Sequence, residues 1–331
     1  MTALLFAAAF LVVAVLVYMA RYSGRVHVAQ TRLIDAPLAA TRAQVVDLRR
    51  WPAWSPWLEH ESEAPPATGD DAAADSYRWA RDGAEMGSVE HLRVRESGRI
   101  EQRLRLVRPF PLHGISSWQL AESEGRTRVT WTVRARVAFS MRAFAATVEG
   151  ALALDVRYAL DRLASLVESE DAPRYEVRYE GLRKLAAIRY AYVEQTGKIG
   201  EQAAAMRKAA SELGATLERE GVLPAGPPVA LYLRTNVKQR TTTCRFCIPN
   251  GDAAVDGIAV ATLPPHRAFV TSLRGSRAQL EIAWYLAMQR LNVLALRPDL
   301  RITPSEHYLD EPDAAPGAGP RTELFIPVLP S

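Results

Sequence analysis

A short polar segment that contains a proline divides this sequence into two stretches, each with its own hydrophobic pattern. The segment reads Ser-Glu-Asp-Ala-Pro over Ser169 to Pro173, and such a composition favours a linker between packed domains. The chain has 331 residues, which is long enough for two domains. We therefore predict an N-terminal anchor over residues 1–24, a first domain over 25–168, a linker over 169–174 and a second domain over 175–331.

The start of the chain is apolar enough to predict a membrane anchor. Residues 2–20 carry no charge, and a run of this length can span a bilayer as a helix. No basic residue precedes the run, which disfavours a cleaved signal peptide. Arg21, Arg25 and Arg32 follow it, so the positive-inside rule predicts a single-pass protein of the bacterial inner membrane with both domains in the cytoplasm. An uncleaved or unusually cleaved export signal is the alternative.

Residues 25–168 show the pattern of a sheet that is closed by one long helix. A strand-like run over 26–34 precedes a helix over 35–48, and short strands alternate with glycine-containing turns from Tyr77 to Ala138. A long amphipathic helix ends the region. Its apolar stripe consists of Phe144, Val148, Leu152, Val156, Leu160, Leu163 and Val167.

This order of elements, together with the phrase Arg-Trp-Pro-Ala-Trp-Ser-Pro-Trp over residues 50–57, resembles the START-like polyketide-cyclase superfamily. The resemblance implies an α+β helix-grip domain, in which a curved antiparallel sheet on a long C-terminal helix encloses a cavity for lipids, hormones or aromatic polyketides. Trp51, Trp54 and Trp57 could line the mouth of that cavity. The alternative is that these tryptophans pack in an ordinary aromatic core.

Residues 175–331 read as two successive halves with the same order of elements. Each half has two strands, an amphipathic helix and two further strands. The helices are predicted over 199–217 and 277–291, and Tyr232 in the first half occupies the place that the strand around Glu306 occupies in the second. Two such halves would meet in a concave surface, which suits a small-molecule site.

The most informative stretch of the second half is Thr303 to Leu309. Read as a strand, it places Glu306 on one face with Ile302 and Tyr308. If that face points inward, the carboxylate needs a partner, since burying an unpaired acid costs free energy. The partner could be a ligand, or the acid could be a structural one that is bonded to an arginine or a backbone amide.

The arrangement of Trp284, Glu306, Tyr308 and a final apolar strand that begins at Thr322 resembles the GyrI-like effector-binding family. The resemblance implies a duplicated α+β domain with a central pocket for apolar, aromatic and cationic small molecules. Glu306, Tyr308, Trp284 and Tyr232 are the residues that we expect to bind the ligand. Trp284 also lies on the apolar stripe of its helix, so core packing is an alternative for it.

Composition and motifs exclude several other functions. There are 41 basic and 37 acidic residues without a concentrated positive region, so nucleic acid is not an expected partner. Cys244 and Cys247 form the single thiol pair; with no second pair, neither a zinc site nor a disulfide framework is expected. The histidines have no metal-ligand spacing, and no phosphate-binding loop or nucleophile elbow occurs. We therefore expect no cofactor.

Two classes of function remain open. The first is a membrane-anchored sensor or sequestering protein for small molecules. The second is a hydrolase, since some GyrI-like proteins open reactive cyclopropane-containing compounds with a tryptophan and a glutamate; Trp284 and Glu306 match those types, and Tyr308 could polarise the leaving group. Lipid or isoprenoid binding or transfer by the first domain is a further alternative.

Overall fold

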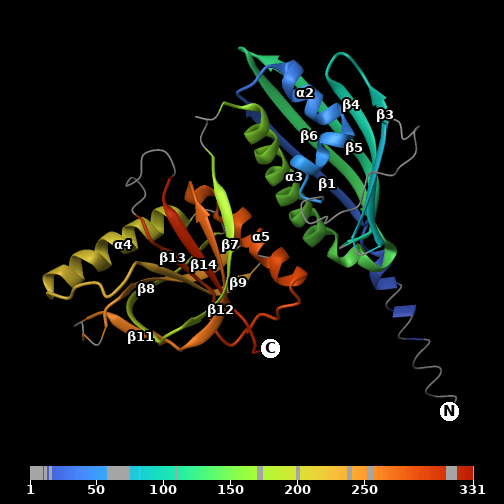
Figure 1. The fold of residues 1–331 in the computed structure, drawn as a ribbon. Coiled ribbons are helices and arrows are strands. Elements are labelled where there is room, and N and C mark those ends of the chain that lie inside the picture. The colour runs from blue at the N-terminus through green and yellow to red at the C-terminus, as the bar shows by residue number, and fades with distance from the viewer. Residues whose placement is uncertain are drawn as a thin grey trace. The chain divides into compact units, whose positions relative to one another are not determined.

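The computed structural model describes residues 10, 13–14, 17–57, 75–81, 83–108, 110–169, 174–198, 202–236, 241–251, 253, 257–310 and 319–330. The chain divides into two compact units, Met1–Ala172 and Pro173–Ser331. Residues 170–173 of the predicted linker lie outside the described residues. The α+β fold class predicted for both domains is confirmed, because each unit combines one antiparallel sheet with helices (Figure 1).

The first unit is a six-stranded antiparallel sheet with the order β1-β6-β5-β4-β3-β2. Only β1 is out of sequence order, and it pairs along its whole length with β6, from Arg25 opposite Arg136 to Ile34 opposite Thr127. The strands are β1 (Arg25–Ile34), β2 (Ser76–Arg81), β3 (Ala84–Val94), β4 (Arg99–Leu106), β5 (Leu112–Ser123) and β6 (Arg126–Val137). The helices are α2 (Leu38–Val46), the 3-10 turn η1 (Leu48–Ala53), the 3-10 turn η2 (Phe139–Phe144) and α3 (Ala145–Val167).

The apolar stripe of α3 meets the sheet as its spacing predicts. The stripe from Val148 to Leu163 is buried with side chains of β1, β4, β5 and β6 in one core. Phe144 is an exception, because it caps the helix and remains exposed. The side chain of Asp161 on this helix forms an ion pair with Arg32 of β1, which ties the helix to the sheet edge.

The second unit is an eight-stranded antiparallel sheet with the order β11-β8-β10-β9-β13-β14-β12-β7. Each half contributes strand, strand, helix, strand, strand. The first half is β7 (Glu176–Leu185), β8 (Ile188–Lys198), α4 (Gln202–Arg219), β9 (Val229–Asn236) and β10 (Thr241–Pro249). The second half is β11 (Ala259–Leu263), β12 (His266–Arg274), the 3-10 turn η3 (Arg277–Gln279), α5 (Leu280–Val293), β13 (Ser305–Tyr308) and β14 (Arg321–Pro327).

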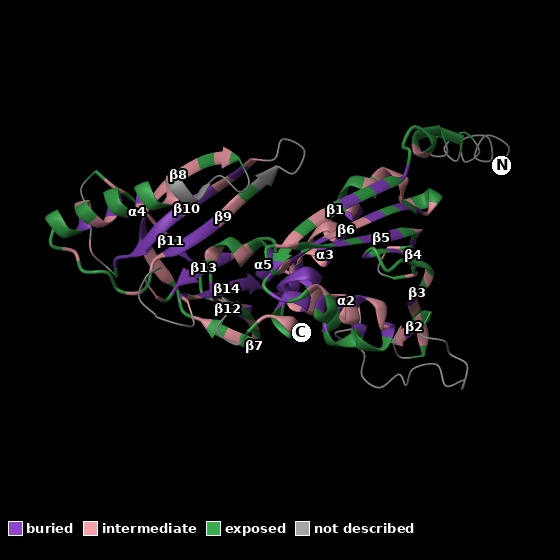
Figure 2. Cartoon of the chain, turned by 90° about the horizontal axis from the view of Figure 1, so that it is seen from above, coloured by how far each residue is buried: buried purple, intermediate pink, exposed green. Residues whose placement is uncertain are grey.

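The sheet order confirms the predicted duplication and adds a feature that the sequence does not show. The order is symmetric about the contact between β9 and β13, which are corresponding strands of the two halves. The first strand of each half pairs in the other half, β7 with β12 and β11 with β8. The halves therefore share one continuous sheet, and the central strands β13 and β14 are buried (Figure 2).

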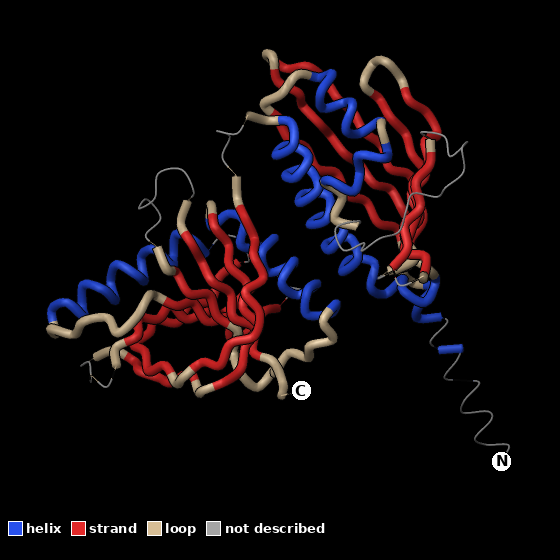
Figure 3. The backbone as a smooth tube through the Cα atoms, in the orientation of Figure 1, coloured by secondary structure: helices blue, strands red, loops and turns tan. Residues whose placement is uncertain are grey.

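Both helices of this unit cover the same face of the sheet (Figure 3). Leu213 of α4 packs in one cluster with Tyr308 and Ala230, and Ala283 of α5 packs with Leu324, whose strand position is opposite Glu306. Leu280 contacts both clusters. This covered face is where Glu306 lies.

One strand boundary differs from the prediction for a local reason. The sequence was divided into strands over 175–179 and 183–192, whereas β7 continues to Leu185. A bulge lets the strand continue, because the pairing with β12 skips Glu180 and Gly181 adopts a positive φ of 86°.

The helices that the structure describes contradict the predicted membrane topology. Within the described part of the chain, no helix has both the length and the apolar composition needed to cross a membrane. Residues 1–9, 11–12 and 15–16 of the predicted anchor lie outside the described residues. The predicted cytoplasmic placement of both domains depended on that anchor, so this prediction is not supported either.

We predict that the two units fold independently. Chains that end at Ser169 or begin at Arg174 should each unfold in a single cooperative thermal transition, because each unit has its own sheet and core. Differential scanning calorimetry of the two fragments and of the full chain measures this. Loss of the transition in either fragment alone would show that the units depend on one another.

Candidate functional site

Glu306 lies near the middle of the eight-stranded sheet. Its strand β13 runs between β9 and β14, where Glu306 is opposite Ala230 on one side and Leu324 on the other. The side chain is 1% exposed. Tyr308 shares its face, as the period-two pattern predicts. Ile302 does not, because the strand begins only at Ser305 and Ile302 packs in a separate cluster with Val229 and Leu231.

Three side chains donate hydrogen bonds to the Glu306 carboxylate. Trp284 Nε1 and Tyr232 Oη both donate to Oε1, at 2.5 Å and 3.0 Å. Tyr308 Oη donates to Oε2 at 2.7 Å. The four residues that the sequence singled out for this domain are therefore brought together around one acid, from β9, α5 and β13.

The donors are neutral, and no basic side chain among the described residues forms an ion pair with Glu306. A carboxylate has about four acceptor positions. Three of them are used here, which leaves one on Oε2. The acid is thus partly but not fully satisfied by the protein groups around it.

The donors also differ in exposure. Tyr308 is buried, whereas Trp284 and Tyr232 are half-buried. Their rings meet edge to face, with centroids 6.0 Å apart, which is a favourable aromatic geometry. A molecule that approaches Glu306 from the half-buried side therefore meets Trp284 and Tyr232 first.

Two further residues belong to this site, and no local sequence pattern pointed to either of them. The guanidinium of Arg277 stacks over the ring of Tyr308 at 4.3 Å and donates to the carbonyl oxygen of Asp310. Cys244 of β10 is buried opposite Tyr232. Both positions depend on strand register and chain reversal, which local sequence patterns do not determine.

Burial controls the protonation of this cluster. Desolvation raises the pKa of Glu306, and the hydrogen bonds from Trp284, Tyr308 and Tyr232 act in the opposite direction. The positive charge of Arg277 also lowers this pKa, by a smaller amount. Desolvation and the neighbouring carboxylate raise the pKa of Tyr232 and of Tyr308 well above the usual tyrosine range. The two phenols therefore remain donors, and Glu306 holds a proton more readily than an exposed glutamate does.

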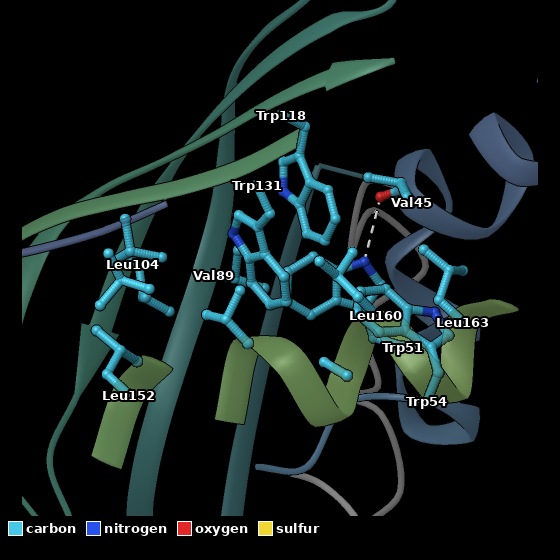
Figure 4. Packing of buried hydrophobic residues seen from close by; sticks show 14 of the residues in the cluster. Val45, Trp51, Trp54, Val89, Leu104, Trp118, Trp131, Leu152, Leu160 and Leu163 are labelled. Atoms are coloured by element: carbon cyan, nitrogen blue, oxygen red, sulfur yellow. Dashed lines mark hydrogen bonds between the residues drawn. The ribbon is translucent and has the colours of Figure 1, made fainter. Parts of the chain in front are cut away.

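The tryptophans proposed for the first domain lie in its core. Trp51 and Trp54 are fully buried and pack with Trp118 and Trp131 (Figure 4). Trp57 is half-buried and stacks on Trp79. This placement corresponds to the core-packing alternative for Trp51 and Trp54, since their rings fill the space between the helices and the sheet.

Buried polar groups accept hydrogen bonds from three of these indoles. Gln102 accepts from Trp118 Nε1 at 2.8 Å, and Ser116 accepts from Trp131 Nε1 at 2.8 Å. Trp51 Nε1 donates to the carbonyl oxygen of Val45 at 3.1 Å. The network stabilises one arrangement of the aromatic core, because an unpaired buried donor costs free energy.

The two cysteines are free thiols. Cys247 packs with Tyr190 and Leu263, on the face opposite the Glu306 site, as their strand spacing predicts. Burial raises the pKa of both thiols. Among the described residues, no group of three or more histidine, cysteine, aspartate or glutamate side chains is placed to hold a metal ion.

Residues 25–168 match the family model described as polyketide cyclase / dehydrase and lipid transport, which confirms the predicted resemblance of the first domain. No curated protein matches the chain. The C-terminal domain of EcmrR is a similar solved structure, with 17% identity and a TM-score of 0.40 over 47% of this chain and 98% of that one.

Two further solved structures show comparable similarity. SAV2435, solved with bound tetraphenylphosphonium, is 14% identical with a TM-score of 0.37, over 46% of this chain and 94% of that one. Protein CV1439 from Chromobacterium violaceum is 17% identical with a TM-score of 0.33, over 44% of this chain and 98% of that one.

The raised pKa of Glu306 predicts a pH-dependent stability. The folded state binds this proton more tightly than the unfolded chain does, so the free energy of unfolding decreases as the pH rises from 4.5 through the raised pKa. Glu306→Gln lacks this titration. The stability of the wild type relative to this variant should therefore be highest at low pH and decline with rising pH.

Urea unfolding of both proteins between pH 4 and pH 8 measures the difference. Glu218→Gln, which changes an exposed glutamate of α4, is the matched control for the loss of a glutamate charge. A constant difference for Glu306→Gln would mean that the Glu306 pKa is the same in the folded and unfolded states.

Proposed function

We propose that the second domain binds small, apolar, aromatic cations and that Glu306 is the anchor for their charge. The observation that carries this proposal is a carboxylate, 1% exposed, that has neutral donors and no ion pair among the described residues. A cationic ligand would supply the missing opposite charge, at the acceptor position that remains on Oε2.

A cation gains more here than it would from a surface carboxylate. The attraction between opposite charges increases as the effective dielectric constant falls, and it is less screened by salt away from water. An acid that is buried without a counter-charge is costly to ionise. Binding of a cation would therefore favour the ionised form of Glu306 and recover part of that cost.

The rings around Glu306 support an aromatic ligand. Trp284, Tyr232 and Tyr308 present aromatic surface next to the acid, and aromatic faces attract cations. Because Glu306 is covered, a ligand has to displace the half-buried Trp284 or Tyr232 to reach it. The domain would thus open on binding, as a sensor or a sequestering protein does.

Tetraphenylphosphonium is a suitable probe, because its charge is surrounded by phenyl rings and it was seen bound to SAV2435. The full chain should bind it, and Glu306→Gln should weaken binding by roughly thirtyfold or more, since loss of one partner of a buried charge pair costs about 2–5 kcal/mol. The change keeps the shape of the side chain and removes its charge. Isothermal titration calorimetry measures the two affinities.

Two controls make the experiment specific. The neutral aromatic triphenylmethanol should bind wild type and Glu306→Gln with similar affinity, and Glu218→Gln should bind the cation as the wild type does. Wild-type affinity of a folded Glu306→Gln protein for tetraphenylphosphonium would contradict the proposal and make Glu306 a structural acid.

Hydrolysis is the second candidate, and the raised pKa of Glu306 is the observation that favours it. A carboxyl group with a raised pKa can serve as a general acid or base, and the Tyr308 hydroxyl lies 2.7 Å from Glu306 as a donor. Mass spectrometry of a reactive cyclopropane-containing compound incubated with the protein separates the two functions. Hydrolysis is supported if the wild type forms the ring-opened product and Glu306→Gln does not. If the wild type forms no product, hydrolysis is eliminated.

A further inference from the structure

The outer face of the first domain carries a hollow of about 450 Å³ with an unusual lining. It extends over the adjacent strands β1, β6 and β5 (Figure 1). We call it the basic hollow. It is lined by Arg25, Val26, His27, His113, Gly114, Arg134, Ala135 and Arg136. The lining thus contains three arginines and two histidines and no carboxylate.

The strand register places the basic side chains directly opposite one another. Arg136 of β6 is paired with Arg25 of β1 on one side and with His113 of β5 on the other. Arg134 is paired with His27. Like charges at directly opposite positions of an antiparallel sheet destabilise it, so this arrangement works against folding.

The same sheet shows how such arginines are compensated elsewhere. On β4, which lies beside β5, Arg103 pairs with Glu90 at 2.6 Å, Arg105 pairs with Glu85 at 3.0 Å, and Arg99 pairs with Glu101 at 3.1 Å. Among the described residues, Arg25, Arg134 and Arg136 form no ion pair. Arg25, Arg134 and Arg136 thus lack the compensation that these arginines of β4 have.

The surroundings of the hollow leave the charge available. Arg25, Arg134 and Arg136 are exposed. The carboxylate of Glu149 on α3 accepts a hydrogen bond from the backbone N–H of His27 at 2.8 Å, which directs it to the edge of β1. Val26 and Ala135 alternate with the basic residues along their strands and are buried in the core of the domain, so at these positions the strands contribute backbone to the lining.

We propose that the basic hollow binds a small organic phosphate, with its phosphate held by Arg134 and Arg136. Phosphate fits this site because it is a dianion, and arginine guanidinium groups bind its oxygens in pairs. A phosphate bound at Arg136 would also reduce the repulsion between Arg136 and the opposite Arg25. The site is in the first domain and is independent of the function proposed for Glu306.

The experiment uses the full chain and 1-naphthyl phosphate as the probe. The wild type should bind it in isothermal titration calorimetry, with an affinity that falls as the salt concentration rises. The double variant Arg134→Thr/Arg136→Thr should bind roughly tenfold or more weakly, because two exposed charge contacts are lost. Threonine suits exposed strand positions, so this variant should melt no lower than the wild type.

Arg99→Thr is the matched control, since it removes an exposed and already paired arginine from the same sheet and should bind like the wild type. If Arg99→Thr loses as much affinity for 1-naphthyl phosphate as the double variant, the attraction is nonspecific and the proposal is overturned. Unchanged binding by the double variant, or no binding by the wild type, would overturn it too. Phosphatidylcholine vesicles that contain phosphatidic acid test whether the phosphate belongs to a lipid. If the protein sediments with these vesicles but does not bind 1-naphthyl phosphate, the proposal is also overturned.

Discussion

The carboxylate of Glu306 depends on donors that come from three different elements of the second domain. Trp284 reaches it from a helix, Tyr232 from a neighbouring strand and Tyr308 from its own strand. Moving any one of these elements would leave a buried acceptor with fewer bonds, which costs free energy. The packing of α5 on the sheet and the contact between β9 and β13 are therefore linked through this one side chain.

The duplicated architecture explains why such a site forms at the centre of the domain. The corresponding strands β9 and β13 meet in the middle of the sheet, and the first strand of each half is exchanged with the other. The exchange makes one continuous sheet, and α4 and α5 cover the face of its central strands that carries Glu306, so this side chain is removed from water. A carboxylate at this position has a raised pKa for the same reason. Affinity for a cation and the capacity to hold a proton thus have a common origin in burial.

The first domain uses its residues differently. Its interior is occupied by tryptophans whose indole N–H groups are partly bonded to buried side chains, and its most unusual surface is the basic hollow on the outer face. Among the described residues, the chain therefore combines an acid that forms no ion pair in one domain with a set of arginines that form no ion pair in the other. The Glu306 site would select a cation, and the basic hollow would select an anion.

The sequence by itself determined the division into two domains, the element order, the duplication in the second half and the residues Glu306, Tyr308, Trp284 and Tyr232. These follow from periodicity and composition, which act over short stretches of chain, and from a family resemblance. Only the tertiary structure decided that the four side chains meet, that Ile302 faces away and that Arg277 stacks on Tyr308. It also placed Trp51 and Trp54 in the core and aligned Arg25 with Arg136. These facts depend on strand register and on contacts between distant segments, which no local pattern of residues specifies.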